Sequence, residues 1–424
     1  MTFEQLNLSA PILQALKTKG YITPTPVQEK SIPAILSGSD VLGSAQTGTG
    51  KTAAFALPLL QLMSDKLTTH GGPISLVLAP TRELAIQIAD NFNLYGKHLH
   101  LKQVVIYGGV SQNPQTAQLR NGVQVIIATP GRLLDLMQQG FVNLNNIKYL
   151  VLDEADKMLD MGFINDIKKI VAKVPHARQT LFFSATLSPE IKRLAGSMLR
   201  NPVSVEVKHE AGTEFLVEEK LFFVEKNNKT ELLTHLLKND AEVTHALVFT
   251  RTKHGADKLV RALAKNRIHS MAIHGNKSQN QRQRALDDFR AKKITILVAT
   301  DVASRGIDVK NLSHVINYDL PEQAESYTHR IGRTGRAGAT GIAISFCSND
   351  EKDLLRDIQK LIKKTVPVRS HDVTFSATPA VDHSERERRP FNRSGRPGSS
   401  NNSSGKSKHP RQRERVSRER NFNR

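Results

Sequence analysis

Residues 45–52 carry the residue types of a phosphate-binding loop. The two glycines let backbone N–H groups turn inward, Lys51 can reach terminal phosphates, and the Thr52 hydroxyl can bind Mg²⁺. The strict pattern of such loops begins with Gly, whereas Ala45 stands there, so a chance Gly-Lys-Thr turn is the alternative from this segment alone. The predicted nucleotide-binding residues are Ala45, Gln46, Thr47, Gly48, Thr49, Gly50, Lys51 and Thr52.

The acidic tetrapeptide at 153–156 supplies carboxylates that suit the same chemistry. It follows the apolar stretch 148–152, which reads as a buried strand, and ligands bind outside the carboxyl end of a parallel strand. Asp153 suits holding Mg²⁺ through water, and Glu154 suits polarising the water that attacks a γ-phosphate. A solvated turn is the usual interpretation of such a tetrapeptide, but a position after a strand and downstream of a phosphate loop favours a site.

A sheet must bring these segments together, and short apolar runs between amphipathic stretches predict one. Strands that alternate with helices favour βαβ units around a parallel sheet, and two series of them predict an α/β fold with two parallel-sheet domains in tandem. The predicted strands are 40–44, 75–79, 123–128, 149–152 and 180–183, then 221–224, 246–249, 270–273, 295–299, 315–318 and 342–346.

Composition and charge limit the class of protein. The chain has 424 residues, more than one core usually spans, and a formal net charge of +20 that favours nucleic acid or an anionic membrane face. No apolar run approaches the length that spans a bilayer, and the amino terminus does not read as a signal peptide, so we expect a cytoplasmic protein that binds no membrane. The only cysteine, Cys347, excludes an intrachain disulfide and reads as a buried strand residue.

Two segments are expected to lie outside the folded domains. Residues 208–216 carry charge, a glycine and little apolar periodicity, which is typical of a flexible linker. Residues 384–424 hold 13 Lys and Arg against 4 Glu among Ser, Asn, Gly and Pro, so they cannot bury a core. A solubilising end is one interpretation, but arginines interspersed with Phe391 and Phe422 favour an RNA-tethering arm. The predicted organisation is a domain at 1–207, a linker at 208–216, a domain at 217–370 and a disordered basic tail at 371–424.

The acidic tetrapeptide spells Asp-Glu-Ala-Asp, and with the motifs around it residues 1–370 resemble a DEAD-box ATP-dependent RNA helicase. The resemblance implies two RecA-like domains, ATP and Mg²⁺ as cofactors, and RNA as partner. Residues 1–29 are similar to the family's Q motif, in which Gln28 would read the adenine edge and Phe3 would pack on the base. A buried amide offers a donor and an acceptor at once, although a lone glutamine would otherwise read as a surface residue.

Three segments of the first half, 80–85, 108–109 and 129–132, resemble the family's RNA-backbone motifs. Hydroxyls, glycine amides and arginines suit gripping phosphates and ribose without reading bases, which predicts weak sequence preference. Taken singly, each segment reads as a turn or a helix cap. The RNA-contacting residues implied here are Pro80, Thr81, Arg82, Gly108, Gly109, Thr129, Pro130 and Arg132.

Ser184-Ala185-Thr186 resembles the family's coupling motif, whose two hydroxyls would hydrogen-bond near Asp156. A plain helix N-cap is the alternative for both hydroxyls.

The second half carries further matches to the family. By resemblance, Arg282 and Thr300 would contact RNA, and Gly306 and Asp308 would bind ATP, the latter at the ribose. Residues 329–336 place arginines at a spacing that can converge on one anion, with glycines for close approach. Their expected roles are arginine fingers for Arg333 and Arg336 and coupling for His329; a solvated basic loop is the alternative.

A phosphate loop and arginine fingers on different domains predict that catalysis requires the domains to close on ATP. Arginine fingers contribute about 10³ to 10⁵ in rate, so the open state should hydrolyse slowly. Two other functions stay open: a DNA-directed translocase of the same broad superfamily, and an RNA-annealing scaffold with vestigial nucleotide binding. The Q motif and the acidic tetrad argue against the first. The second is opposed by four intact residues: Lys51, Glu154, Arg333 and Arg336.

The compact core with an arginine-rich tail looks like the bacterial RhlE-like branch of the family. That resemblance implies a monomer that remodels RNA in ribosome assembly, RNA decay or cold adaptation. Ribosomal particles and RNA-decay proteins are the partners that it implies.

Overall fold

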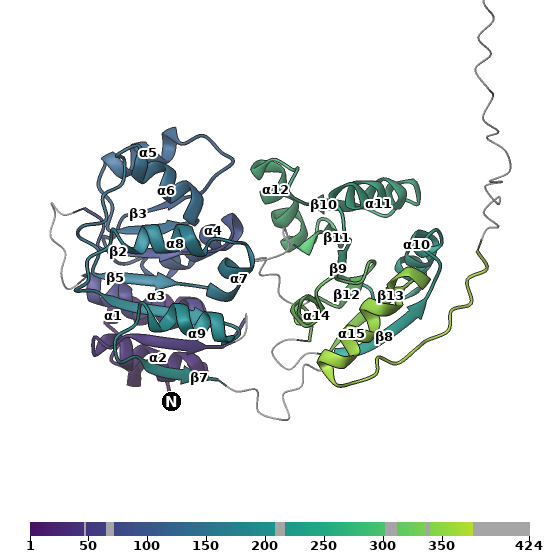
Figure 1. The fold of residues 1–424 in the computed structure, drawn as a ribbon, viewed down its shortest axis with the longest axis horizontal. Helices are drawn as coiled ribbons and strands as arrows, with labels where there is room; N and C mark the ends of the chain where they lie inside the picture. The colour runs from purple at the N-terminus through teal and green to yellow at the C-terminus, as the bar shows by residue number, and fades with distance from the viewer. Residues whose placement is uncertain (46–47, 65–71, 208–216, 302–311, 336–339, 376–424) are drawn as a thin grey trace, which may run out of the picture. The chain divides into compact units, whose positions relative to one another are not determined.

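The computed structural model describes residues 1–45, 48–64, 72–207, 217–301, 312–335 and 340–375. They contain two parallel sheets, each with helices on both faces (Figure 1). The predicted α/β class with two parallel-sheet domains is therefore confirmed. We refer to the described residues up to 207 as the N lobe and to those from 217 to 375 as the C lobe. The predicted linker at 208–216 and the chain from 376 onward lie outside the described residues.

The N lobe has a seven-stranded parallel sheet in the order β3-β4-β2-β5-β6-β1-β7. Its central strands are almost wholly apolar because both faces are covered. The strands are β1 (Val41–Ser44), β2 (Ser75–Leu78), β3 (Gln103–Ile106), β4 (Val125–Ala128), β5 (Tyr149–Leu152), β6 (Gln179–Ser184) and β7 (Val203–Glu206).

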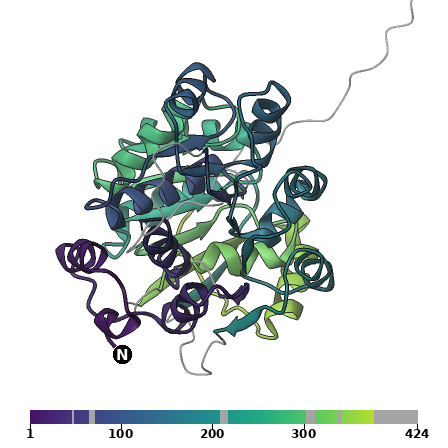
Figure 2. The same cartoon turned by 90° about the vertical axis from the view of Figure 1, so that its left-hand side faces the viewer.

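Alternate strand residues of the N lobe point into two separate cores. One core packs against α1 to α4, whose purple amino-terminal members lie together in Figure 2, and the other against α6 to α9. The helical elements are η1 (Phe3–Leu6), α1 (Ala10–Thr18), α2 (Pro26–Leu36), α3 (Lys51–Ser64), α4 (Arg82–Tyr95), α5 (Asn113–Arg120), α6 (Pro130–Gln138), α7 (Ala155–Asp160), α8 (Ile164–Val171) and α9 (Pro189–Gly196).

The C lobe has a six-stranded parallel sheet in the order β10-β11-β9-β12-β13-β8. Its strands are β8 (Val217–Phe223), β9 (Ala246–Phe249), β10 (Ser270–Ile273), β11 (Ile296–Ala299), β12 (His314–Asn317) and β13 (Gly341–Cys347). Its described helical elements are α10 (Lys229–Asn239), α11 (Lys253–Lys265), α12 (Gln279–Arg290), α14 (Ala324–Ile331), η2 (Asn349–Glu351) and α15 (Lys352–Ile362). Cys347 is buried at the end of β13, as predicted.

The chain after α15 packs back on the edge strand β8. The Leu221 N–H donates to the Pro367 carbonyl (2.9 Å), and the Arg369 N–H donates to the Leu221 carbonyl (2.8 Å). Val373 and Phe375 then contact a C-lobe core. The packed part of the C lobe therefore extends to Phe375, beyond the domain end predicted at 370. The reason is that the apolar side chains of Val373 and Phe375 are partly buried against this core.

No helix within the described ranges is long and apolar enough to cross a membrane.

Candidate active site

The predicted site segments of the N lobe follow the carboxyl ends of its strands. Because the sheet is parallel, all these ends meet at one edge. The phosphate loop follows β1, the coupling motif follows β6 and the acidic tetrapeptide follows β5, and these three strands are neighbours. The RNA-backbone segments follow β2, β4 and β3, which are also neighbours. The edge therefore divides into a phosphate half and an RNA half that meet between β5 and β2.

The phosphate loop ends in a helix whose first residue is Lys51. Gly48 and Gly50 have φ of 92° and 94°, a conformation that favours glycine. The Lys51 ammonium is buried and donates to the Ala45 carbonyl at 2.7 Å, so the lysine is folded back over its own loop. Gln46 and Thr47 lie outside the described residues.

The Q-motif glutamine binds the phosphate loop directly. Its Oε1 accepts from the Thr25 N–H (2.9 Å), and its Nε2 donates to the Gly50 carbonyl (3.1 Å). Gln28 therefore caps α2 and steadies the loop, with both ends of the amide engaged within the protein. Phe3 is 3% exposed and belongs to the core beneath α1 to α4.

Glu154 forms a buried ion pair with Lys157, a residue that the sequence analysis did not single out. The Lys157 Nζ lies 2.8 Å from the Glu154 Oε1, and the two side chains are 4% and 3% exposed. Glu154 precedes α7 with a φ of 54°, a strained conformation for a residue with a side chain, and such strain gathers at functional sites. The spacing i, i+3 could have suggested this pair.

The two acidic neighbours have opposite protonation tendencies. Burial raises the pKa of Asp153 to about 6, a shift that Lys51 opposes and Glu154 reinforces. Burial also opposes the charge of Glu154, but Lys157 and then Lys51 outweigh it and lower its pKa to about 2. Glu154 is thus a carboxylate at neutral pH, which is the form that a group polarising water needs.

Asp156 joins the acidic tetrapeptide to the segment after β6. Its Oδ2 accepts hydrogen bonds from the Ala185 N–H (3.1 Å), the Thr186 N–H (3.0 Å) and the Thr186 hydroxyl (3.2 Å). The expectation that both hydroxyls lie at Asp156 holds for Thr186 only. The Ser184 hydroxyl donates instead to the Thr186 carbonyl at 2.8 Å, because strand β6 turns its side chain toward the following bend.

Two of the three RNA-backbone segments, 80–85 and 129–132, lie at helix starts. Thr81 is the N-cap of α4, where its hydroxyl accepts from the Leu84 N–H (3.3 Å), and Thr129 precedes α6, which begins at Pro130. Exposed helix amino termini attract phosphates. The helix-cap interpretation and the RNA interpretation are thus compatible at these threonines.

Two arginines bind the loop after β3, which contains Gly108 and Gly109. A Cβ on Gly109 would stand 2.3 Å from the Arg82 Nη1, so this glycine admits the guanidinium. The Arg132 guanidinium donates to the Val110 carbonyl at 3.3 and 3.4 Å. The three segments therefore form one joined surface at the ends of β2, β4 and β3.

In the C lobe, Arg330 is a residue that the sequence analysis missed. Its guanidinium makes two 2.6 Å bonds to the carboxylate of Asp301, and its Nη1 donates to Asn317 (3.0 Å) and to the Asp319 carbonyl (2.7 Å). It is 2% exposed. Arg330 therefore joins α14 to the chain after β11 and β12. The sequence feature that could have identified it is its position three residues before Arg333.

The structure describes four of the remaining predicted residues of the C lobe. Arg333 is 6% exposed, and His329 lies on α14. Arg282 lies on α12 and Thr300 follows β11, each 9% exposed. Gly306, Asp308 and Arg336 lie outside the described residues.

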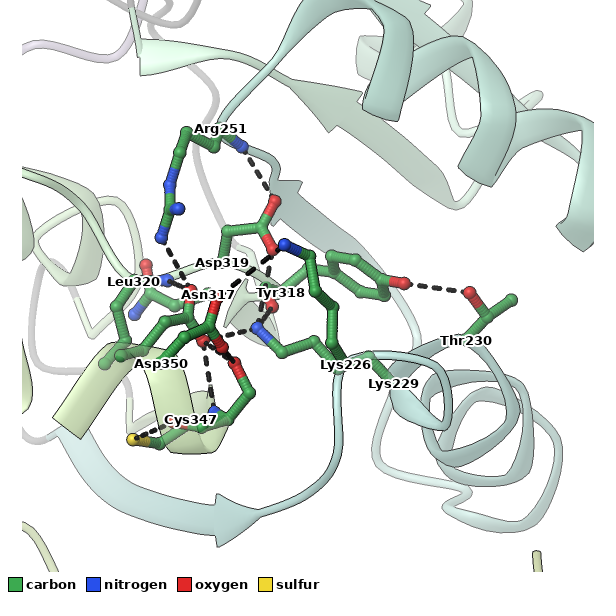
Figure 3. A network of polar contacts seen from close by, with 12 residues as sticks. Lys226, Lys229, Thr230, Arg251, Asn317, Tyr318, Asp319, Leu320, Cys347 and Asp350 are labelled. Carbon is green, nitrogen blue, oxygen red and sulfur yellow. Dashed lines mark hydrogen bonds and ion pairs between the residues drawn. The ribbon is translucent and has the colours of Figure 1, made fainter. Parts of the chain in front are cut away.

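A buried network stiffens the same edge of the C-lobe sheet (Figure 3). The Lys229 ammonium, 1% exposed, donates to the Tyr318 carbonyl (2.8 Å) and pairs with Glu351 (2.5 Å). The other Glu351 oxygen pairs with Arg251 at 2.8 Å. The network joins α10 to the ends of β9, β12 and β13, next to the strand ends that hold Arg330.

Comparison with known proteins identifies the family. Residues 25–194 match the model "DEAD/DEAH box helicase", and residues 228–338 match "Helicase conserved C-terminal domain". The ATP-dependent RNA helicase CshA of Limosilactobacillus reuteri is 42% identical over 86% of this chain and 72% of its own length. The ATP-dependent RNA helicase DeaD of Escherichia coli K12 is 44% identical over 86% of this chain and 58% of its own length.

The chain belongs to the DEAD-box family of ATP-dependent RNA helicases. It spans about seven tenths of CshA and less than two thirds of DeaD. Among solved structures, a DEAD-box protein of Methanococcus jannaschii is 42% identical with a TM-score of 0.51, covering 87% of this chain and 99% of that one. Saccharomyces cerevisiae Dbp5 bound to RNA and ADP BeF3 is 31% identical with a TM-score of 0.76, covering 87% and 94%. Both DEAD-box lobes thus have solved counterparts.

Proposed function

We propose that this DEAD-box protein hydrolyses ATP when RNA binds and uses the cycle to separate short RNA duplexes or to remodel RNA–protein complexes. One observation carries the proposal: the Glu154–Lys157 ion pair, the Lys51 loop and the Asp156–Thr186 contact lie at three adjacent strand ends. Glu154 would polarise the attacking water, Lys51 would leave the Ala45 carbonyl to bind the β- and γ-phosphates, and Asp156 would pass the change to the coupling segment.

Asp153 and Thr52 fit a Mg²⁺ ion. Mg²⁺ takes oxygen ligands, keeps several waters and needs one or two carboxylates besides the phosphates of its nucleotide. Asp153 supplies a buried carboxylate within the field of Lys51, and Thr52 supplies a hydroxyl on the first turn of α3. When bound, Mg²⁺ would neutralise the charge that develops on the phosphates.

Adenine recognition is proposed for Gln28. Its amide already lies within 3.1 Å of the loop at Gly50, so a base at this place could take over its hydrogen bonds. Guanine presents the reversed donor and acceptor on its edge, which would favour ATP over GTP. Phe3 is proposed to pack on the base, as the family resemblance implies, and its side chain is 3% exposed here.

RNA would lie along the ends of β2, β4 and β3 and continue on the C lobe at Arg282 and Thr300. The donors there are helix N–H groups, hydroxyls and guanidinium groups, which recognise phosphate and ribose and read no base edge. Weak sequence preference follows from this set. The similar structure of Saccharomyces cerevisiae Dbp5, which is bound to RNA, supports the assignment.

Arg333 and Arg336 are proposed as arginine fingers that complete the site when the two domains, 1–207 and 217–370, close across the linker at 208–216. The bonds of Arg330 hold α14 firmly, so the finger three residues later starts from a fixed base. RNA binding to both lobes would favour the closed arrangement and so stimulate hydrolysis.

The test is ATP hydrolysis, measured as phosphate release with RNA, with DNA of the same sequence and without nucleic acid. We expect RNA to stimulate ATP hydrolysis by the wild type and DNA to stimulate it little. RNA should not stimulate hydrolysis by Lys51→Ala, whereas Lys97→Ala, on the same lobe, should respond like the wild type. Stimulation by DNA alone would indicate the translocase, and RNA annealing with no hydrolysis would indicate the scaffold.

An isolated N lobe that hydrolyses ATP as fast as the whole chain, with or without RNA, would contradict the shared site.

At the level of the cell, we propose a monomer of the RhlE-like branch that acts in ribosome assembly, RNA decay or cold adaptation, with ribosomal particles or decay proteins as partners. The arginine-rich composition of 384–424 supports this branch. Crosslinking the protein to cellular RNA and mapping the bound transcripts would choose among the three pathways.

A further inference from the structure

A basic cavity lies in the N lobe, at the amino-terminal ends of the strands, opposite the candidate active site. It has a volume of about 290 Å³ and is lined by residues of α8, of the loop before β6 and of the segment between α9 and β7. Thr180, at the start of β6, forms part of its wall. The candidate active site follows the carboxyl ends of the strands, so this cavity belongs to a different surface of the lobe.

The lining of the cavity is rich in hydrogen-bond donors and contains no carboxylate. Four of its ten lining residues are basic, two carry hydroxyls and the other four are apolar. The six polar residues are Lys168, His176, Arg178, Thr180, Ser197 and Arg200. Such a set suits an anion with several oxygens. It includes no Phe, Tyr or Trp ring on which a base could stack.

Arg178 is held in place by the protein. Its Nε donates to the Thr180 hydroxyl (3.1 Å), and its Nη1 donates to the Pro175 carbonyl (2.8 Å). Its Nη2 makes no hydrogen bond to any residue that the structure describes. A fixed, half-buried guanidinium with one nitrogen still available is preorganised to bind an oxyanion.

The cavity also carries a net positive charge. Burial and then the charge of Arg200 lower the pKa of Arg178, which means that the two guanidinium groups repel each other. The Asp40 carboxylate lies nearby and opposes this shift, and its oxygens accept the N–H groups of Thr180 and Arg200, both at 2.7 Å. It supplies one negative charge against the three Lys and Arg side chains of the cavity. In the described part of the chain, Lys168 and Arg200 form no ion pair. A bound anion would relieve this repulsion.

We propose that this cavity binds a backbone phosphate of an RNA strand, outside the stretch that the helicase motifs grip. RNA is the phosphate-bearing polymer that the chain is proposed to engage, and a donor set without a base-stacking ring recognises the backbone alone. This inference rests on the proposed function. Free phosphate offers the same chemistry, so the test separates the two sources.

The first arm uses the full chain with Lys168→Glu and Arg200→Glu combined. The matched control is Lys19→Glu with Lys97→Glu, two exposed lysines of the same lobe. Affinity is measured for a single strand of about 10 nucleotides and for a strand several times longer. We expect the cavity variant to lose about tenfold in affinity for the long strand only, and its salt slope to fall by about 0.7 to 1.4. An unchanged affinity and slope would overturn the RNA assignment.

The second arm follows the Arg178 Nε–H resonance by NMR, assigned with Arg178→Lys, as inorganic phosphate is added. A saturable shift in the wild type that the cavity variant lacks supports a phosphate site. If phosphate shifts the resonance while the first arm shows no effect, the ligand is free phosphate and RNA is rejected; no response in either arm rejects the site. ATP hydrolysis stimulated by the short strand reports the proposed function separately, and the cavity variant should retain it.

Discussion

Glu154 and Lys157 stabilise each other's charge inside the N lobe, so their substitutions should separate catalysis from folding. Glu154→Gln should lower kcat for ATP hydrolysis by at least about 100-fold, because an amide cannot polarise the water. It should also lower the free energy of unfolding of the lobe by about 3 kcal/mol, since Lys157 is left buried without its carboxylate. The measurements are phosphate release and denaturant unfolding.

The double variant Glu154→Gln with Lys157→Met is the control for this pair. Removing both charges of a buried pair is often neutral, so stability should recover while hydrolysis stays lost. If the double variant loses as much stability as Glu154→Gln and Lys157→Met lose separately when summed, the ion pair contributes nothing to the stability of the lobe.

His314 should make the stability of the C lobe depend on pH. It is fully buried at the start of β12, its Nε2 has no hydrogen-bond partner among the described residues, and burial lowers its pKa. The neutral form is therefore favoured in the folded state, and the unfolded state binds the proton more readily. The free energy of unfolding should be highest above about pH 6.5 and fall as the pH is lowered from there.

Denaturant unfolding at pH 8 and pH 5.5 of the wild type and His314→Gln checks this expectation. The substituted chain should lose less stability between the two conditions. Equal losses in both chains would show that His314 does not contribute.

At this scale, residue types and spacing indicated which groups could act in catalysis, and those roles stay predictions. They did not indicate the partners of these groups inside the protein. The phosphate loop and acidic tetrapeptide could be predicted because their chemistry requires consecutive residues after a strand. Arg330 was missed because its four bonds join segments up to 29 residues apart. Ser184 was misplaced because the direction of a hydroxyl depends on the bend that follows β6.

At the scale of elements, the start of β13 packs against the loop residues Thr334 and Gly335, which follow the proposed arginine finger Arg333. A Cβ on Gly341 would stand 2.2 Å from the Thr334 Oγ1 and 2.4 Å from the Gly335 nitrogen. Gly341→Ala should push this loop away and lower kcat by at least about tenfold, part of the 10³ to 10⁵ that such fingers supply. Phosphate release with saturating RNA measures the effect.

Gly275→Ala is the matched control, because nothing lies within 4 Å of the added methyl group. It should retain wild-type hydrolysis. If both alanine variants hydrolyse ATP alike, the position of the loop is not set by β13.

Most strands could be predicted from apolar runs, and two could not. Strands β3 (QVVI) and β7 (VSVE) lie at the two edges of the N-lobe sheet, where alternate or most residues are partly exposed. Their patterns lack the continuous apolar run of a strand covered on both faces, which is the signal that found the others. These two segments form strands because of their pairing with neighbouring strands in the folded sheet, which their own sequences do not reveal.

At the scale of the whole molecule, the basic segment 384–424 should strengthen RNA binding through charge. Its removal should weaken binding and reduce the salt dependence by about 0.7 in slope for each phosphate that the segment no longer neutralises. Binding is measured over a range of salt concentrations. A chain with the same segment in shuffled order should bind like the wild type, because charge neutralisation depends on composition. An unaltered slope after removal would falsify the tether.

The phosphate and RNA halves of the N-lobe edge meet where β5 lies beside β2. Leu152 and Leu78 are register partners, and the Asp153 N–H donates to the Leu78 carbonyl at 3.0 Å. Neighbouring strands are only about 4.8 Å apart. We expect a change at a nucleotide bound near Asp153 to cross this single backbone hydrogen bond before it reaches the chain that leads to Pro80 and Thr81, so communication within this lobe would require no distant relay.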